Sequence, residues 1–80
     1  MSFSAIETGK RIKQFRKAQN ISQFDLGQDI YISRNYVSKL ENGRRVAKIE
    51  IYISLAEHFG VSLDELLLGR KQVEGVNESH

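Results

Sequence analysis

Serines at helix-start positions constrain the fold of this chain more than any other sequence feature. Ser4, Ser22 and Ser62 are each followed three residues later by an acidic side chain. At this spacing, the side chains can cap the free N–H groups in the first turn of a helix. Ser33 precedes another stretch with apolar residues at helical spacing, and the chain contains no Pro. The sequence therefore predicts an all-α fold.

These start signals, and the glycines that follow, bound five expected helices. They cover residues 5–19, 23–30, 34–42, 48–59 and 63–68. The helix over 48–59 lacks a good N-terminal capping residue, and its buried face is expected to hold Ile49, Tyr52, Leu55, Ala56 and Phe59. Residues 1–69 should form one domain, whereas residues 70–80 are polar and without periodicity. This last segment is expected to be a disordered tail.

The composition argues against several classes of protein. The chain has 80 residues and no Cys, so neither a disulfide framework nor a thiolate metal site is expected. Its two histidines, His58 and His80, are too few and too far apart for a zinc site or a catalytic triad, and no Gly-rich phosphate loop or nucleophile motif is present. We therefore expect no enzyme, no metal and no cofactor. No apolar run approaches the roughly 18 residues of a membrane helix, and residues 1–4 lack the features of a signal peptide, which favours a cytoplasmic protein.

Charge is distributed unevenly along the chain. Residues 1–48 hold ten basic and four acidic side chains (+6), whereas residues 49–80 hold two basic and six acidic ones (−4). Such polarity fits a protein that turns one face to a polyanion. Charge alone also fits an ordinary solvated surface, so the nucleic-acid interpretation requires a motif.

The window from Gln23 to Asn42 provides that motif. Two short expected helices are joined by the three-residue turn Tyr31-Ile32-Ser33, as in a helix-turn-helix unit. Apolar residues lie where the two helices must pack on each other and on the first helix: Leu26, Ile30, Val37 and Leu40, with Ile32 below the turn. Gly27 lies where the helices approach closely and only a very small side chain fits.

The third expected helix has an outer face suited to reading DNA. At about 100° per residue, Val37 and Leu40 share one side. The opposite side carries Arg34, Asn35, Ser38, Lys39 and Asn42. That face has no carboxylate, and Arg, Lys and Asn side chains can hydrogen-bond the edges of guanine and adenine in the major groove. A helix face that is only exposed to solvent, without a partner, usually includes Glu or Asp.

Several segments together resemble the Cro and phage-repressor type (Xre-like) helix-turn-helix family. They are Gly9-Lys10-Arg11-Ile12-Lys13-Gln14-Phe15-Arg16, Ile21-Ser22-Gln23, Ser33-Arg34-Asn35-Tyr36-Val37-Ser38-Lys39-Leu40-Glu41-Asn42-Gly43, Leu55-Ala56 and Gly60-Val61-Ser62-Leu63-Asp64-Glu65-Leu66-Leu67. The resemblance covers about residues 9–69. It implies a five-helix, phage-repressor-like domain, prokaryotic or of phage origin and associated with the nucleoid when bound. The implied function is sequence-specific binding of double-stranded DNA by a transcriptional regulator, with repression as the leading expectation.

The resemblance also implies roles for individual residues. Base contacts are expected from Arg34, Asn35, Ser38 and Lys39, and phosphate contacts from Gln23, Ser33, Asn42, Arg44, Arg45 and Lys48. Arg16 and Glu41 match a structural ion pair. The alternatives are that Arg16 is a free charge facing DNA and that Gln23 is a simple first-turn residue. Tyr31 stands where the family usually has Gly, and Ala47 where it commonly has Pro.

Two further expectations concern partners. Surplus apolar residues on the last two helices, Ile51, Ile53, Leu67 and Leu68, suggest the interface of a homodimer on a pseudo-palindromic operator. Scattered apolar residues on the surface are the alternative. The other function that remains open is an antitoxin, or another protein-interaction partner, that also binds its own promoter.

Overall fold

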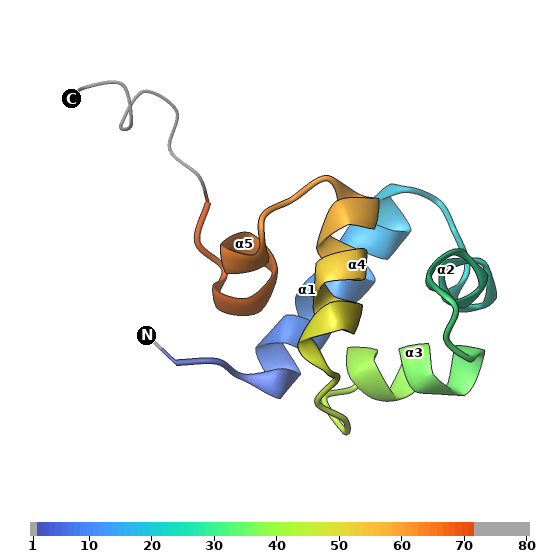
Figure 1. Cartoon of the computed structure of the whole chain (residues 1–80), viewed down its shortest axis with the longest axis horizontal. Helices are drawn as coiled ribbons and strands as arrows, with labels where there is room; N and C mark the ends of the chain where they lie inside the picture. Colours follow the sequence, from blue (N-terminus) through green and yellow to red (C-terminus); the bar gives the residue numbers. More distant parts are fainter. Residues whose placement is uncertain (1, 72–80) are drawn as a thin grey trace.

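The computed structural model describes residues 2–71 and contains five α-helices there, with no strand in that part of the chain (Figure 1). The helices are α1 (Ala5–Ala18), α2 (Gln23–Ile30), α3 (Arg34–Glu41), α4 (Ile49–Phe59) and α5 (Leu63–Leu68). The predicted all-α fold is confirmed, and three of the expected ranges are one residue too long at one end. Within residues 2–71, none of the helices is both long and apolar enough to span a membrane. The expected tail falls outside the described residues apart from Arg70 and Lys71.

Four of the helices begin at the predicted serines. The hydroxyl oxygens of Ser4, Ser22, Ser33 and Ser62 each accept a hydrogen bond of 3.0–3.2 Å from the N–H three residues on. The fifth helix, α4, has no side-chain cap. Just before it, the N–H of Ala47 donates to the Tyr52 hydroxyl at 3.1 Å. A Pro, which the family commonly has here, would need no such acceptor, so Tyr52 satisfies the donor that Ala47 adds.

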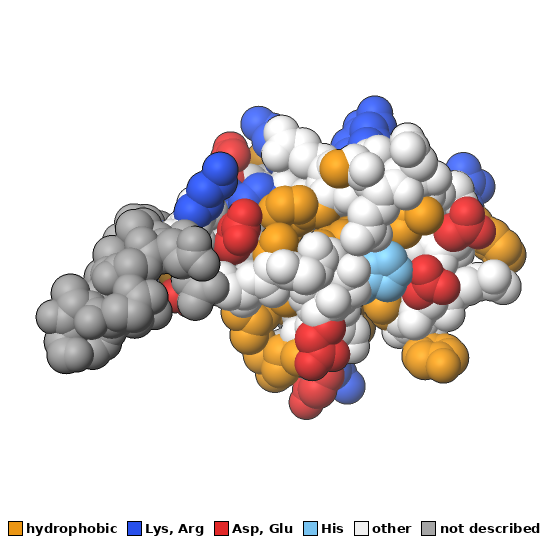
Figure 2. Space-filling view, turned by 90° about the horizontal axis from the view of Figure 1, so that it is seen from above, with side chains coloured by type: hydrophobic (Ala, Val, Ile, Leu, Met, Phe, Trp, Pro, Cys, Tyr) orange, Lys and Arg blue, Asp and Glu red, His pale blue; other side chains and the backbone are white. Residues whose placement is uncertain are grey.

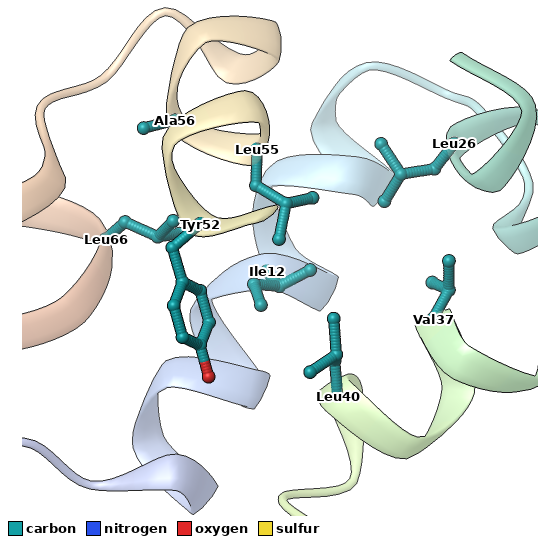
Figure 3. Close-up of a cluster of buried hydrophobic side chains, with 8 residues drawn as sticks. All are labelled: Ile12, Leu26, Val37, Leu40, Tyr52, Leu55, Ala56 and Leu66. Atoms are coloured by element: carbon teal, nitrogen blue, oxygen red, sulfur yellow. The ribbon is translucent and has the colours of Figure 1, made fainter. Parts of the chain in front are cut away.

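All five helices contribute to one core (Figure 3). Its buried apolar side chains are Ile12, Leu26, Val37, Leu40, Tyr52, Leu55, Ala56 and Leu66. Ile30 and Ile32 pack against it from the helix-turn-helix unit. The packing residues predicted for α2 and α3 therefore do face inward, which leaves the opposite side of α3 free.

The buried face of α4 differs from the expected one at its beginning. Ile49 is 50% exposed, so its predicted inward position is wrong, and Ile51 packs against the core instead. With 3.6 residues per turn, Ile49 lies about a quarter turn from the middle of the face that Tyr52 and Leu55 define. At the first residue of the helix, it projects past the edge of the core.

Two glycines allow helices to approach closely. A Cβ on Gly27 would lie 2.5 Å from the carbonyl oxygen of Ile32, which confirms that the turn requires a very small residue there. Gly9 was not predicted to have this role. A Cβ at Gly9 would overlap the carbonyl oxygens of Leu40 and Glu41, so α1 lies directly against the end of α3. The close contact at Gly9 does have a signal in the sequence, because a Gly in the interior of a helix lowers the stability of the helix by about 1 kcal/mol relative to Ala.

Arg11 holds the end of α5 rather than facing a partner. Its Nε donates to the carbonyl oxygen of Leu66 at 2.7 Å and its Nη2 to that of Leu67 at 2.9 Å. Carbonyl groups in the last turn of a helix have no partner within the helix. Arg11 therefore satisfies two of them and joins α1 to the end of α5.

The turn between α2 and α3 keeps a left-handed conformation without the usual Gly. Tyr31 has φ 65° and ψ 42°, and its side chain is 93% exposed. The N–H groups of Tyr31 and Ile32 both donate to the carbonyl of Gly27, so the end of α2 fixes this geometry. Tyr31 thus bears backbone strain without burying its ring.

Tyr31→Gly is therefore expected to raise the melting temperature. Relief of the left-handed strain is worth about 1–2 kcal/mol, and the greater freedom of Gly in the unfolded chain offsets roughly 0.4–1 kcal/mol of it. A net gain of up to about 1.6 kcal/mol corresponds to several degrees for a domain of this size. Thermal unfolding followed by circular dichroism measures it, with Tyr31→Ala as the control that removes the ring but keeps the strain. A lower melting temperature for the Gly variant would mean that the ring stabilises the fold.

Candidate nucleic-acid interface

The outward face of α3 presents polar and basic side chains. Arg34, Asn35 and Lys39 are exposed, as is Asn42 just after the helix, and Ser38 between them is half-buried. Val37, Leu40 and Glu41 are buried on the other side. Because the carboxylate of Glu41 is buried, the exposed surface of the helix has no acidic group. Such a face can donate hydrogen bonds to base edges and is not repelled by phosphates.

The two ends of this face are held by local hydrogen bonds. At the start, the Ser33 oxygen accepts from the N–H of Tyr36 at 3.0 Å, which leaves the hydroxyl proton free to donate. At the end, the Asn42 Nδ2 lies 3.4 Å from the Ser38 oxygen. Residues expected to contact phosphates therefore lie at both ends of the helix expected to contact bases.

A basic loop leaves α3 through a tight turn. Gly43 has φ 71°, and its N–H donates to Leu40 while that of Arg44 donates to Lys39, the pattern of a Schellman motif. The guanidinium carbon of Arg45 lies 5.0 Å from the centre of the Tyr36 ring on α3. Arg44, Arg45 and Lys48 are all exposed. The loop thus presents three exposed basic side chains, and the stack on Tyr36 places Arg45 beside α3.

Arg16 and Glu41 form a buried ion pair between α1 and the end of α3. The Arg16 Nε lies 2.6 Å from Glu41 Oε2, and Nη2 lies 3.1 Å from Oε1. Their side chains are only 10% and 2% exposed, and Arg16 Nη1 also donates to the carbonyl of Ile21 at 2.9 Å. In the structure, Arg16 is therefore not a free charge facing DNA.

Gln23 joins this pair, an interaction that the sequence did not predict. Its Nε2 donates to Glu41 Oε1 at 3.0 Å, so the first residue of α2 contacts the last residue of α3. An amide nitrogen carries two N–H groups. The second one can still donate to a phosphate, and Gln23 is more than a simple first-turn residue.

The side chains expected at a dimer interface are less available than the sequence suggested. Ile51 and Leu67 pack against the core, Leu68 is half-buried, and Ile53 is 39% exposed. Exposed apolar side chains gather around a shallow groove of about 240 Å³ beside the basic loop, and of the expected interface residues only Leu67 lines it. This groove is lined by Phe3, Val46, Ala47, Ile49, Tyr52 and Leu67. We call it the loop groove.

The end of the molecule away from α3 has a different character. Figure 2 looks onto that end, where acidic, basic and apolar side chains are mixed. His58 of α4 lies there, with its Nε2 2.9 Å from Asp29 Oδ2 of α2. This mixture is typical of an ordinary solvated surface, in contrast to the carboxylate-free face of α3.

Several known proteins are similar to this chain in sequence. A helix-turn-helix family model matches residues 12–66. The HTH-type transcriptional activator BcrR of Enterococcus faecalis is 31% identical over 68 residues, covering 85% of this chain and 33% of BcrR. The antitoxin PezA of Streptococcus pneumoniae is 30% identical over 70 residues, covering 88% of this chain and 44% of PezA. This chain thus spans less than half the length of each of these relatives.

Among solved structures, the P22 c2 repressor in complex with a synthetic operator is similar in fold and sequence. The TM-score is 0.76 and the identity 30%, with 79% of this chain and 96% of the repressor chain covered. The aligned part of this chain therefore corresponds to nearly the whole repressor chain in that structure.

Proposed function

The chain belongs to the helix-turn-helix family of the Cro and phage-repressor type, and we propose that it regulates transcription by binding an operator in double-stranded DNA. The observation that carries this proposal is the exposed, carboxylate-free face of α3, held against the core on its other side. Repression of the bound promoter, by occlusion of polymerase, is the mode we favour. The protein acts in the cytoplasm, on the nucleoid, and not as an enzyme.

The proposed contacts divide into two sets. Arg34, Asn35, Ser38 and Lys39 read bases in the major groove, and Gln23, Ser33, Asn42, Arg44, Arg45 and Lys48 contact phosphates. The burial and hydrogen bonds described above support this division, because the first set lies along the outward face of α3 and the second set surrounds it.

Selection of binding sites from random double-stranded DNA tests the proposed function. We expect a defined consensus, with half-sites about 34 Å, or one helical turn, apart. Affinity should fall steeply with salt, since phosphate contacts release counterions. If no sequence were enriched over the starting pool, the chain would not be a sequence-specific DNA-binding protein.

We also propose that two copies bind one operator, with the loop groove as their contact. The groove lies directly beside the basic loop, which we propose to contact phosphates. A second copy that binds in the groove would therefore lie close enough to contact the same DNA. Its exposed apolar residues, Phe3, Val46 and Ile49, are few. A stable interface usually buries about 1,200–2,000 Å², so this contact should form mainly on DNA.

Analytical ultracentrifugation, with and without the selected operator, tests this dimer. We expect a monomer in free solution and two copies per operator. Val46→Asn or Ile49→Asn should abolish cooperative binding to two half-sites but leave binding to one half-site unchanged. Ile53→Asn, on the surface favoured by the sequence, is the matched control. Loss of cooperativity in that variant alone would place the interface on the outer face of α4 instead.

The similarity to PezA favours one second candidate, an antitoxin that also binds its own promoter. The neighbouring genes distinguish the two roles. A toxin-like reading frame beside this one would favour the antitoxin, whereas a methyltransferase, an endonuclease or a divergent phage promoter would favour a regulator.

A further inference from the structure

We propose that Tyr36 is a positioning residue for DNA binding that holds Arg45 ready for its phosphate contact, so that Arg44 and Arg45 are not equivalent. The inference rests on the proposed function. Its basis is the stack in which the Arg45 guanidinium lies 5.0 Å from the centre of the Tyr36 ring, within the range of a cation–π interaction.

The ring is a fixed platform. Tyr36 lies in the first half of α3 and is partly buried, and its side chain packs against the core. It lies beside the base-reading face without belonging to it, since its neighbours Asn35 and Val37 point outward and inward. A guanidinium stacked on this ring therefore lies along the flank of α3.

The backbone of the loop brings Arg45 back to this flank. Gly43, in the left-handed conformation, reverses the chain, and the N–H of Arg44 bonds to the carbonyl of Lys39 at 2.9 Å. A Cβ on Gly43 would lie 2.8 Å from atoms of Ile6, so α1 packs directly against the turn. Arg44 thus contributes its backbone to the turn, whereas Arg45 contributes its side chain to the stack.

Stacking reduces the conformational entropy that the arginine side chain loses when it binds a phosphate. A free Arg must give up much of its rotamer freedom to contact a phosphate, whereas a stacked one has already lost part of it. Stacking uses the face of the guanidinium and leaves its N–H edges free to donate. Lysine carries the same charge, but its strongly hydrated ammonium group is not planar and cannot reproduce this arrangement.

Charge-conserving variants test the proposal, with Arg44 as the matched control. The dissociation constant for the selected operator is measured over a range of salt concentrations. Arg45→Lys should weaken binding by about 2–5-fold, the worth of an exposed cation–π contact, with an unchanged salt slope. Arg44→Lys keeps the charge and removes no stack on Tyr36, so its loss of affinity should be clearly smaller than that of Arg45→Lys. Equal losses in the two variants would overturn the inference.

Variants of the ring give the second test. Tyr36→Phe keeps the platform and should bind as the wild type does. Tyr36→Leu should weaken binding by the same factor as Arg45→Lys, and adding Arg45→Lys to it should cause little further loss. Additive losses in the double variant would also overturn the inference. Because Tyr36 packs on the core, circular dichroism is used to check that the Tyr36→Leu variant is folded. If this variant does not fold, the comparison of Arg45→Lys with Arg44→Lys decides whether the inference holds.

The outcomes separate the two proposals. If the wild type enriches no operator, the proposed function fails. If the wild type binds and Arg45 behaves like Arg44, only the role of Tyr36 fails.

Discussion

Glu41→Ala is expected to lower the free energy of unfolding by about 3–5 kcal/mol, because it leaves Arg16 charged and buried without its partner. A small domain has a total stability of about 5–15 kcal/mol, so this variant should be partly unfolded at physiological temperature. The loss also removes the acceptor of Gln23, and with it the only direct side-chain hydrogen bond recorded between α2 and α3 in residues 2–71. Chemical denaturation followed by circular dichroism measures the effect.

The chain offers a matched control for this prediction. Lys10 and Glu7 form an ion pair of 3.6 Å on α1, with side chains 65% and 57% exposed. Lys10→Ala removes that pair and should cost no more than about 1 kcal/mol. A double-mutant cycle on Arg16 and Glu41 isolates their coupling, and the combined change to Met and Leu should recover much of the stability. If the cycle shows no coupling, the pair does not hold α1 to α3.

The second large effect is expected in the sequence preference of the protein. Arg34→Ala, Asn35→Ala and Lys39→Ala should each cost about 1–3 kcal/mol on the best site and relax the preference at individual base pairs. Arg44→Ala should weaken binding to all sequences alike and flatten the salt dependence. Repeating the selection with each variant, together with salt titrations, measures both quantities. An unchanged consensus in all three α3 variants would mean that another surface reads the DNA.

Local signals in the sequence were sufficient to predict most of the fold. Serine caps and closing glycines act within one helical turn, so they mark helix ends whatever the rest of the chain does. The start of α4 has no such signal, and there Ile49 was wrongly assigned to the core, whereas Ile51, expected on an outer surface, packs against it. Their positions are decided by distant packing, including the edge of the Phe3 ring against Tyr52, with ring centres 6.0 Å apart.

The candidate site could be predicted in part for the same reason. The exposed face of α3 follows from helical periodicity within eight residues. The contacts of Arg11 with Leu66 and Leu67, and the stack of Arg45 on Tyr36, follow from how the helices and the loop pack. A basic residue in a sequence shows its charge but not its partner, so the contacts of Arg11 with the end of α5 could not be predicted.

The charges at the two ends of α3 have a consequence for how firmly this helix is formed. Arg34 opens it and Glu41 closes it, which is the reverse of what the helix macrodipole favours. Eight residues are also too few for a stable helix in isolation. In the folded domain, Arg16 places a positive charge at the C-terminal end of α3. DNA phosphates near the N-terminal end would supply the missing negative charge. The dipole of α3 is therefore compensated at both ends only when the helix is bound to DNA.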